Sequence, residues 1–445
     1  MIGSLNKMMT QEELPLKIDG LDAYQTKLLN SSPEWLKAFR QKAFEKFIEL
    51  GIPTVKEEEW KYTSLAELSS KSLQIASHHK LTESNQFQAY IDAADINIVL
   101  VNGVLWGDLS NIKHLPAGLT IKSFTDAAAH LPLEVKDTVS KLTANDPREL
   151  LSLNQALFLD GVFIKVENNT VVKPLIHIVH VTSNVEQDTV VFPRSLIHVG
   201  QGAEVSILES HIGFTPNGYW SNGVTDMRIG ENAHVQYCKA EGEASHTVHT
   251  ATTRIWQERS SHLEAFSFAH KAKLVRHNFT ILFKGEGCNT SLNGFYAIDT
   301  TQHVDNHTLL DIQQPNCTSY QLYKGILKDS SRAVFNGKIF VHPIAQKTNG
   351  YQLNKHLMLG KEARVDTKPQ LEIFADDVKC THGATIGQLS DEEIFYLQSR
   401  CITKELASQL LAKGFIDDII SMISSSAIRQ KLGKLLAKKF PEVKL

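Results

Sequence analysis

The chain has 445 residues, of which 42% are hydrophobic and 21% are charged, and its formal net charge is −3. This is the composition of a globular protein of roughly two to three folding units. Outside the C-terminal tail, whose lysines we expect on a solvated helix face, no basic block indicates nucleic-acid binding. No apolar run approaches the ~20 residues that span a bilayer, and residues 1–10 lack a signal-peptide core. We therefore expect a cytoplasmic protein without a membrane segment.

The cysteines are few, odd in number and far apart, unlike the dense framework of a small disulfide-bonded secreted protein. None forms a Cys-x-x-Cys pair, which excludes a zinc ribbon and a thioredoxin-type motif. We expect reduced thiols. The five residues are Cys238, Cys288, Cys317, Cys380 and Cys401.

Residues 1–95 are predicted to form a helical N-terminal domain. Ser32 and Pro33 suit the start of an amphipathic helix, and Gly51 with Pro53 ends it. Between them, apolar residues recur at steps of three and four, as on one helix face. They are Leu36, Phe39, Ala43, Phe47 and Leu50.

Residues 96–386 are predicted to form a β core, because short alternating runs rich in β-branched residues replace the helical pattern. One helical interruption is expected over 133–158. Small or polar triplets also recur along this segment at steps of 30, 28, 27 and 29 residues. They are Ala203-Glu204-Val205, Ala233-His234-Val235, Ser261-His262-Leu263, Cys288-Asn289-Thr290 and Cys317-Thr318-Ser319.

A recurrence of this length is typical of stacked repeats. Short strands without helices between them then indicate a parallel β-helix, that is, a flattened β-solenoid. A β-sandwich is the alternative, since its strand spacing is similar but needs no period. The open ends of a solenoid would be candidate protein-binding surfaces.

Residues 387–445 are predicted to form a helical C-terminal domain. Ser390 and Glu393 make a capping box, Thr403 can cap a second helix, and Gly414 is expected to end it before further helices. A segment of this size buries little core alone, so we expect it to pack on the solenoid or on a partner.

The most unusual residues for chemistry are Cys380 and His382, within the run from Ala375 to Thr385. On a strand they share one face, and thiolate and imidazole suit iron or zinc. The pair offers only half of a four-ligand site. Lys379 and His382 are also expected to lower the thiol pKa of Cys380. The alternative is a buried cysteine beside a hydrogen-bonded histidine.

Other candidates give weaker signals. His303 and His307 would lie about 13 Å apart on a strand, too far for one ion, so structural hydrogen bonding is the expected role. No phosphate-binding loop or G-x-S-x-G motif occurs. Four aspartates that a polysaccharide-active β-helix enzyme could use show no supporting spacing, and solvated turns are expected. They are Asp160, Asp226, Asp305 and Asp311.

Several longer blocks are similar to the SufB/SufD family of iron–sulfur cluster assembly proteins. Glu59-Trp60-Lys61-Tyr62-Thr63 resembles the SufD branch, and the Lys434–Leu445 end lacks the acidic tail usual in SufB. Six further blocks resemble the core of the family. They are Leu153–Gly161, Ser331–Ile339, Ala345–Gly350, Pro369–Ile373, Ala375–Thr385 and Phe395–Arg400.

This resemblance implies a right-handed parallel β-helix between helical domains and a non-catalytic scaffold role. It implies pairing with SufB through the β-helix, and binding of the ATPase SufC through the C-terminal helical domain. A transient iron–sulfur cluster would form at the SufB–SufD interface, with His382 as a ligand and Cys380 close by, and none would be held tightly by the isolated chain. A homodimer in isolation stays open, as do a polysaccharide-active enzyme and a plain adaptor.

Overall fold

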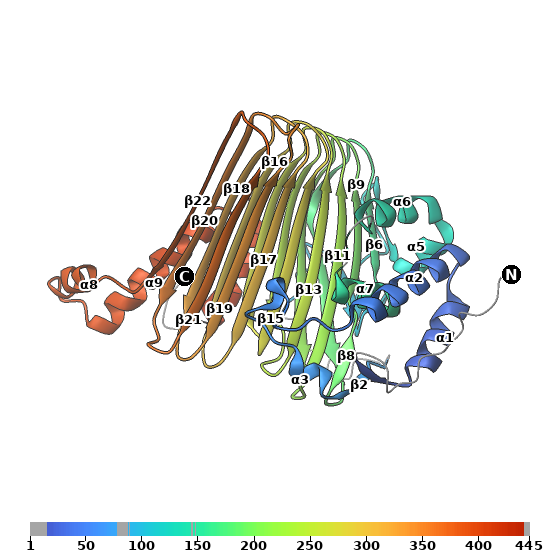
Figure 1. Ribbon diagram of the computed structural model, residues 1–445, viewed down its shortest axis with the longest axis horizontal. Coiled ribbons are helices and arrows are strands. Elements are labelled where there is room, and N and C mark those ends of the chain that lie inside the picture. The colour runs from blue at the N-terminus through green and yellow to red at the C-terminus, as the bar shows by residue number, and fades with distance from the viewer. Residues whose placement is uncertain (1–15, 78–87, 89, 144–145, 147, 440–445) are drawn as a thin grey trace.

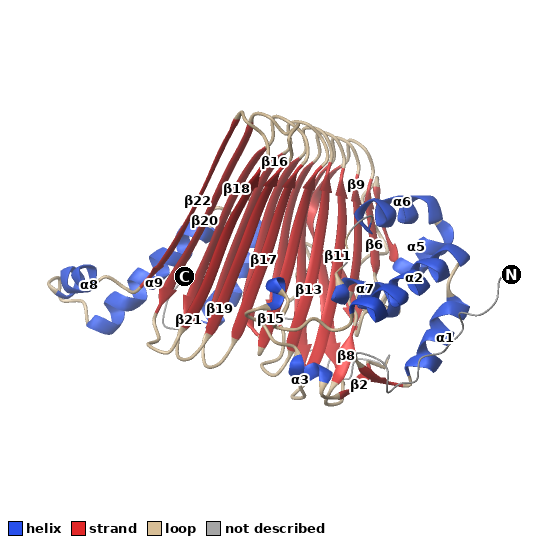
Figure 2. Ribbon diagram, viewed as in Figure 1, coloured by secondary structure: helices blue, strands red, loops and turns tan. Residues whose placement is uncertain are grey.

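Two large facing sheets form the body of the computed structural model, which describes residues 16–77, 88, 90–143, 146 and 148–439 (Figures 1 and 2). Sheet 1 has 12 strands and sheet 2 has 10. The long strands alternate between the sheets, and each pairs in parallel with the strand two further along the chain. This is a flattened β-solenoid of about eight turns, as predicted. Parallel pairing excludes the β-sandwich alternative, whose strands would run antiparallel.

The long strands of sheet 1 are β11 (Tyr219–Ile229), β13 (Val248–Gln257), β15 (Leu274–Phe283), β17 (His303–Ile312), β19 (Arg332–Val341) and β21 (Arg364–Ile373). Those of sheet 2 are β7 (Val171–Ser183), β10 (Glu204–Phe214), β12 (His234–Gly242), β14 (His262–Lys271), β16 (Asn289–Ile298), β18 (Thr318–Leu327), β20 (Thr348–Met358) and β22 (Val378–Gly387). Short strands complete the two sheets: β1 (Lys17–Asp19), β2 (Ser72–Ile75), β3 (Ile96–Val101), β4 (Val104–Leu105), β5 (Leu119–Ser123), β6 (Val162–Val166), β8 (Thr189–Val191) and β9 (Arg194–Val199).

The recurring triplets of the sequence mark the turns of the solenoid. Glu204 pairs with His234, His234 with His262, His262 with Asn289, and Asn289 with Thr318. Each triplet therefore stacks directly on the next at the start of a sheet 2 strand. The small first residue of each triplet is buried below 2% exposure, which explains why this position holds only Ala, Ser or Cys.

Helices from the N-terminal part cover one end and the outer face of sheet 1. They are α1 (Leu21–Ser31), α2 (Glu34–Leu50), α3 (Ala66–Ser69), α5 (Phe124–His130), α6 (Pro132–Thr143) and α7 (Glu149–Leu157), with a 3₁₀ turn at Glu58–Trp60. The interruption expected over 133–158 is α6 and α7. One detail of the prediction was wrong: Ser32 does not cap α2, because its hydroxyl donates to the carbonyl oxygen of Leu28 at the end of α1.

The C-terminal helices are α8 (Asp391–Gln398), α9 (Lys404–Ile420) and α10 (Ser426–Lys439). α9 and α10 bury an apolar face on the outer side of sheet 2 through Ile416, Ile419 and Leu432, as the small size of this region led us to expect. The predicted stop at Gly414 was wrong, because α9 continues through it. Burial of Ile416 and Ile419 beyond the glycine outweighs its helix penalty of about 1 kcal/mol.

The lysines of the tail do not all lie on a solvated face. Lys431 pairs with Asp95 at 2.8 Å, and Lys439 pairs with Asp299 at 2.6 Å, so α10 is tied to the solenoid. Residues 1–10, where a signal core was sought, and the last six residues lie outside the described chain. Among the described helices, none is long and apolar enough to cross a membrane. The domain boundaries at 95 and 386 stay predictions.

Candidate functional site

Cys380 and His382 lie on β22, the last strand of sheet 2 (Figure 1). Cys380 is in register with Gly350 and His382 with Gln352, both on β20. Within the described residues no strand pairs with the other edge of β22. The two side chains therefore lie at the open end of the solenoid, whereas the sequence spacing predicted only that they share one face of a strand.

Both side chains point toward the inner wall of the solenoid. Val378 and Cys380 pack against the apolar core between the sheets, and His382 shares their face because side chains alternate along a strand. Cys380 is half-buried, whereas His382 is exposed. Cys380 therefore covers the last part of the apolar core, whereas the imidazole of His382 is accessible at the open end of the solenoid.

The thiol of Cys380 is not activated in the isolated chain. Burial raises its pKa, and a backbone hydrogen bond with Gly350 offsets this only in part. The expected lowering by Lys379 and His382 was wrong. Lys379 points to the opposite face of the strand, so its charge does not offset the loss of hydration.

The inner wall next to this pair is polar. The amide of Gln352 donates to Gln321 at 2.8 Å, and the amide of Gln321 donates to Thr308 at 2.6 Å. Two buried oxygens here, Oε1 of Gln352 and Oγ of Ser319, have no hydrogen-bond partner among the described residues. The open end therefore offers acceptors that a group bound beside His382 could use.

His303 and His307 have structural roles, as predicted. Both lie on β17, and both contact the segment that carries the Glu59–Thr63 motif. The hydroxyl of Thr63 lies 3.3 Å from Nε2 of His303, and Nδ1 of His307 lies 3.0 Å from a carboxylate oxygen of Glu59. The motif thus docks the N-terminal segment on sheet 1.

The four aspartates considered for a polysaccharide-active enzyme are not solvated turn residues, so that expectation was wrong. Asp226 is fully buried between Arg194 and Arg254. Asp305 is fully buried beside Arg276. Their carboxylates are thus engaged in ion pairs across the strands of sheet 1. Asp160 accepts from Thr125 at 3.0 Å, and Asp311 pairs with His342 at 2.8 Å. The contacts of these four aspartates give no support to a catalytic acid–base pair of carboxyl groups.

Sequence reasoning missed a second polar cluster, which lies inside the solenoid. It contains His180, Glu209, His211, Glu243 and His249, all at most 4% exposed. These residues come from β7, β10 and β13 and from the turn after β12. The repeat period could have indicated part of it, because His180 and His211 are 31 residues apart and stack in register.

A large surface hollow lies elsewhere, on the outer side of sheet 1. It has a volume of about 830 Å³, and residues 57–60 and 148–151 form part of its wall. Both signs of charge line it, for example Glu57 and Arg148. None of the described residues that line it lies on β22, so it does not belong to the Cys380–His382 site.

Comparison with known proteins shows the family of the chain. The family model described as the SUF system FeS cluster assembly SufBD core domain matches residues 180–415, and the SufBD N-terminal region matches residues 18–178. The chain belongs to the SufBD family of iron–sulfur cluster assembly proteins.

Among individual relatives, a SufBD family protein of Synechocystis is 32% identical over 96% of each chain. The iron–sulfur cluster assembly protein SufD of Escherichia coli is 29% identical over 90% of this chain and 92% of its own. SufD of Bacillus subtilis is 26% identical over 92% of this chain and 95% of its own. The resemblance drawn from the sequence blocks is thereby confirmed.

Proposed function

We propose that the chain is a SufD-type scaffold subunit that pairs with SufB and contributes His382 to an iron–sulfur cluster assembled between the two. The supporting observation is the position of Cys380 and His382 on an unpaired edge strand, facing the inner wall. Thiolate and imidazole are iron ligands, but two ligands do not complete a cluster site. The remaining ligands must come from a facing surface, so the cluster is a shared and transient substrate.

The open end of the solenoid supports pairing with another chain of the family. β21 and β22 end their sheets, and neither has a partner on its outer edge among the described residues. Unpaired strand edges recruit further strands. Apolar side chains are exposed near the same end, with Phe374 at 58% and Ile386 at 49%. A second solenoid docked here would cover both the backbone groups and these side chains.

The C-terminal helices supply a surface for an ATPase partner. The chain has no phosphate-binding loop, so ATP hydrolysis belongs to another protein, for which we propose SufC. On α8, Phe395 is 72% exposed and Tyr396 is 55% exposed. Neighbouring aromatic side chains exposed to this degree are typical of an interaction surface.

Substitution Phe395→Asp tests this surface. We expect SufC to be lost from the co-purified complex while SufB remains, because a charge replaces an apolar anchor. Leu133→Asp is the matched control, since Leu133 is a large apolar side chain on α6 with 82% exposure. If the Phe395 variant recovers as much SufC as the wild type, the ATPase binds to a surface other than α8.

Substitution His382→Ala tests the ligand role. The chain is co-expressed with SufB and SufC and purified without oxygen, and iron and sulfide are measured on the complex. We expect subunit stoichiometry to be unchanged and cluster content to fall about tenfold or more, since weakening even a supporting contact costs that much. His262→Ala, an exposed histidine on the outer face of sheet 2, is the control. Equal cluster content in both variants would refute the assignment.

A further inference from the structure

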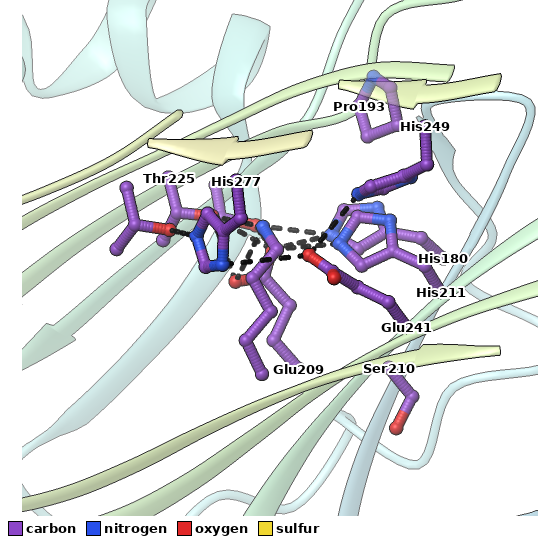
Figure 3. Close-up of polar contacts among 12 residues, drawn as sticks. His180, Pro193, Glu209, Ser210, His211, Thr225, Glu241, His249 and His277 are labelled. Atoms are coloured by element: carbon purple, nitrogen blue, oxygen red, sulfur yellow. Dashed lines mark hydrogen bonds and ion pairs between the residues drawn. The ribbon is translucent and has the colours of Figure 1, made fainter. Parts of the chain in front are cut away.

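The inner space of the solenoid holds a histidine–carboxylate triad far from β22. His180 on β7 and His211 on β10 are paired residues of adjacent parallel strands, and their rings stack with centroids 4.6 Å apart. Nε2 of His180 lies 2.9 Å from Oε1 of Glu209, and Nε2 of His211 lies 3.8 Å from the same oxygen. Figure 3 shows the two rings side by side within the polar cluster.

His211 is the residue that points to a bound ligand. Its side chain is 1% exposed, and neither ring nitrogen has a hydrogen-bond partner among the described residues. Leaving a buried polar group unpaired costs about 1–3 kcal/mol. The ring is not misdirected, however, because Nε2 faces Glu209 and Nδ1 faces Glu243 at 3.9 Å. Both distances are too long for hydrogen bonds and leave room for an intervening atom.

The spacing of the three donor atoms suits one metal ion. Two atoms that each lie 2.0–2.1 Å from an ion can be up to about 4.2 Å apart. The two nitrogen–oxygen separations, 2.9 and 3.8 Å, fall within that limit, and all three donor atoms lie within 4.8 Å of one another. The 4.8 Å bound exceeds the limit by about 0.6 Å, so one ion would require the donor atoms to approach one another by at most about that distance.

The surroundings would hold the triad in place. Oε1 of Glu209 accepts hydrogen bonds from Ser195 at 2.9 Å and from Thr225 at 3.0 Å, and Oε2 accepts from Thr225 at 2.8 Å and from Tyr237 at 2.5 Å. These donors fix the carboxylate with Oε1 beside the two imidazoles. With Nε2 of His211 on a metal, its Nδ1–H points at the Glu243 carboxylate, the usual arrangement behind a metal-bound histidine.

The charge balance of the cluster also favours a divalent cation. Three buried carboxylates, Glu209, Glu241 and Glu243, face one buried ammonium, Lys239. With neutral histidines this leaves two uncompensated negative charges, and isolated buried charges are very costly. A bound divalent cation would offset both charges.

We propose that the solenoid interior binds one divalent first-row transition metal ion through Nε2 of His180, Nε2 of His211 and Oε1 of Glu209. Two imidazoles and one carboxylate with open positions are a donor set typical of iron(II), and they also accept cobalt(II) and zinc. A neutral imidazole has one free lone pair, so His211 serves one ion and the stoichiometry is one per chain. The site is distinct from the Cys380–His382 pair and does not depend on SufB, SufC or the proposed function.

The test uses the full-length, tag-free chain in a Cys380→Ser/His382→Ala background, which removes the open-end ligands. The metal-stripped protein is titrated with cobalt(II) under anaerobic conditions, and bound metal and visible absorption are measured. We expect one equivalent with a nitrogen- and oxygen-ligand spectrum. Adding Glu209→Gln or His211→Ala should weaken binding at least tenfold, whereas His356→Ala, a buried lumen histidine bonded to Tyr296, should not.

Two results would overturn the proposal. One is no stoichiometric cobalt binding by the folded background protein, and the other is equal affinity in the Glu209→Gln variant and the His356→Ala control. Circular dichroism reports whether each variant folds. If the triad variants do not fold, X-ray absorption of the cobalt-loaded background protein decides, because two imidazoles in the first shell support the site and fewer contradict it.

Discussion

The carboxylate of Asp305 is a buried charge whose partners are all identified. It lies on β17 at 0% exposure, 2.5 Å from Arg276 and 2.9 Å from His307, and it accepts from Thr63. Burial raises its pKa, but Arg276 and His307 lower it more, so the net pKa is well below the usual range. The ionised form therefore stabilises the fold at neutral pH and joins sheet 1 to the Glu59–Thr63 motif.

Replacing Asp305 by Asn should destabilise the protein by about 3–5 kcal/mol at pH 7, because Arg276 is left buried without a counter-charge. Urea unfolding measures this difference. A lowered pKa gives stability that is present above the unfolded-state value of about 3.9 and lost as the pH falls further. The difference in the free energy of unfolding between wild type and variant should therefore shrink below about pH 4. Asp311→Asn, on a more exposed ion pair with His342, should cost less than about 1 kcal/mol, and an equal cost in both would contradict the argument.

For single residues, the sequence predicted which face of a strand a side chain occupies better than it predicted the burial and the partners of that side chain. Alternation placed Cys380 and His382 on one face correctly, since that depends only on strand geometry. The pKa of Cys380 depends on burial at the end of the solenoid, which no local pattern reports. The partners of Asp226 and Asp305 are arginines on neighbouring strands about 30 residues away, so their burial could not be seen either.

Helix α9 shows how packing decides where an element ends. Gly414 is a helix stop by its local preference, yet Ile416 and Ile419 beyond it are fully buried against sheet 2. Burying such a side chain yields about 1.5–3 kcal/mol, more than the glycine costs. The recurring triplets, in contrast, predicted the stacking of the strands correctly. Their spacing in the sequence equals the register between paired strands of sheet 2, so the sequence pattern directly reflects the packing.

Gly414→Ala should therefore stabilise the protein by about 0.5–1 kcal/mol. The glycine lies inside α9, and no atom beyond its neighbours and the helix backbone lies within 4 Å of a Cβ placed there. Thermal unfolding followed by circular dichroism measures the gain. The contrasting variant is Gly294→Ala on β16, whose Cβ would lie 2.2 Å from the Tyr323 ring, and it should lower the melting temperature. A destabilised Gly414 variant would mean that α9 bends there.

The whole molecule is a solenoid with one covered end and one open end. Helices α1, α2 and α5 cover the first turns, whereas β21 and β22 end their sheets without a partner among the described strands (Figure 1). The sequence period predicted the stack, but not the interior chemistry. The polar cluster inside the solenoid joins side chains that come from different turns of the solenoid. In the sequence, His180 and His211 fit the ordinary alternation of a strand, so nothing there marks them as members of a cluster.

An unpaired edge with exposed apolar side chains leads us to expect self-association when no partner is present. The isolated chain should form a dimer whose fraction rises with protein concentration, because an end-to-end contact would cover the β22 edge and Ile386. Ile386→Lys should shift the chain to monomer at the same concentration, since it places a charge in that contact. Light scattering after size-exclusion chromatography measures both.

Val171→Lys is the matched control, because Val171 is also a β-branched strand residue, 53% exposed, but lies on β7 near the covered end. It should leave the dimer unchanged. Adding SufB should convert the wild-type dimer to a heterodimer, since both partners compete for one edge, and Ile386→Lys should weaken this complex as well. A dimer that persists in the Ile386 variant would place the contact on another surface. A wild-type chain that stays monomeric at every concentration would show that the edge is too weak to pair with itself.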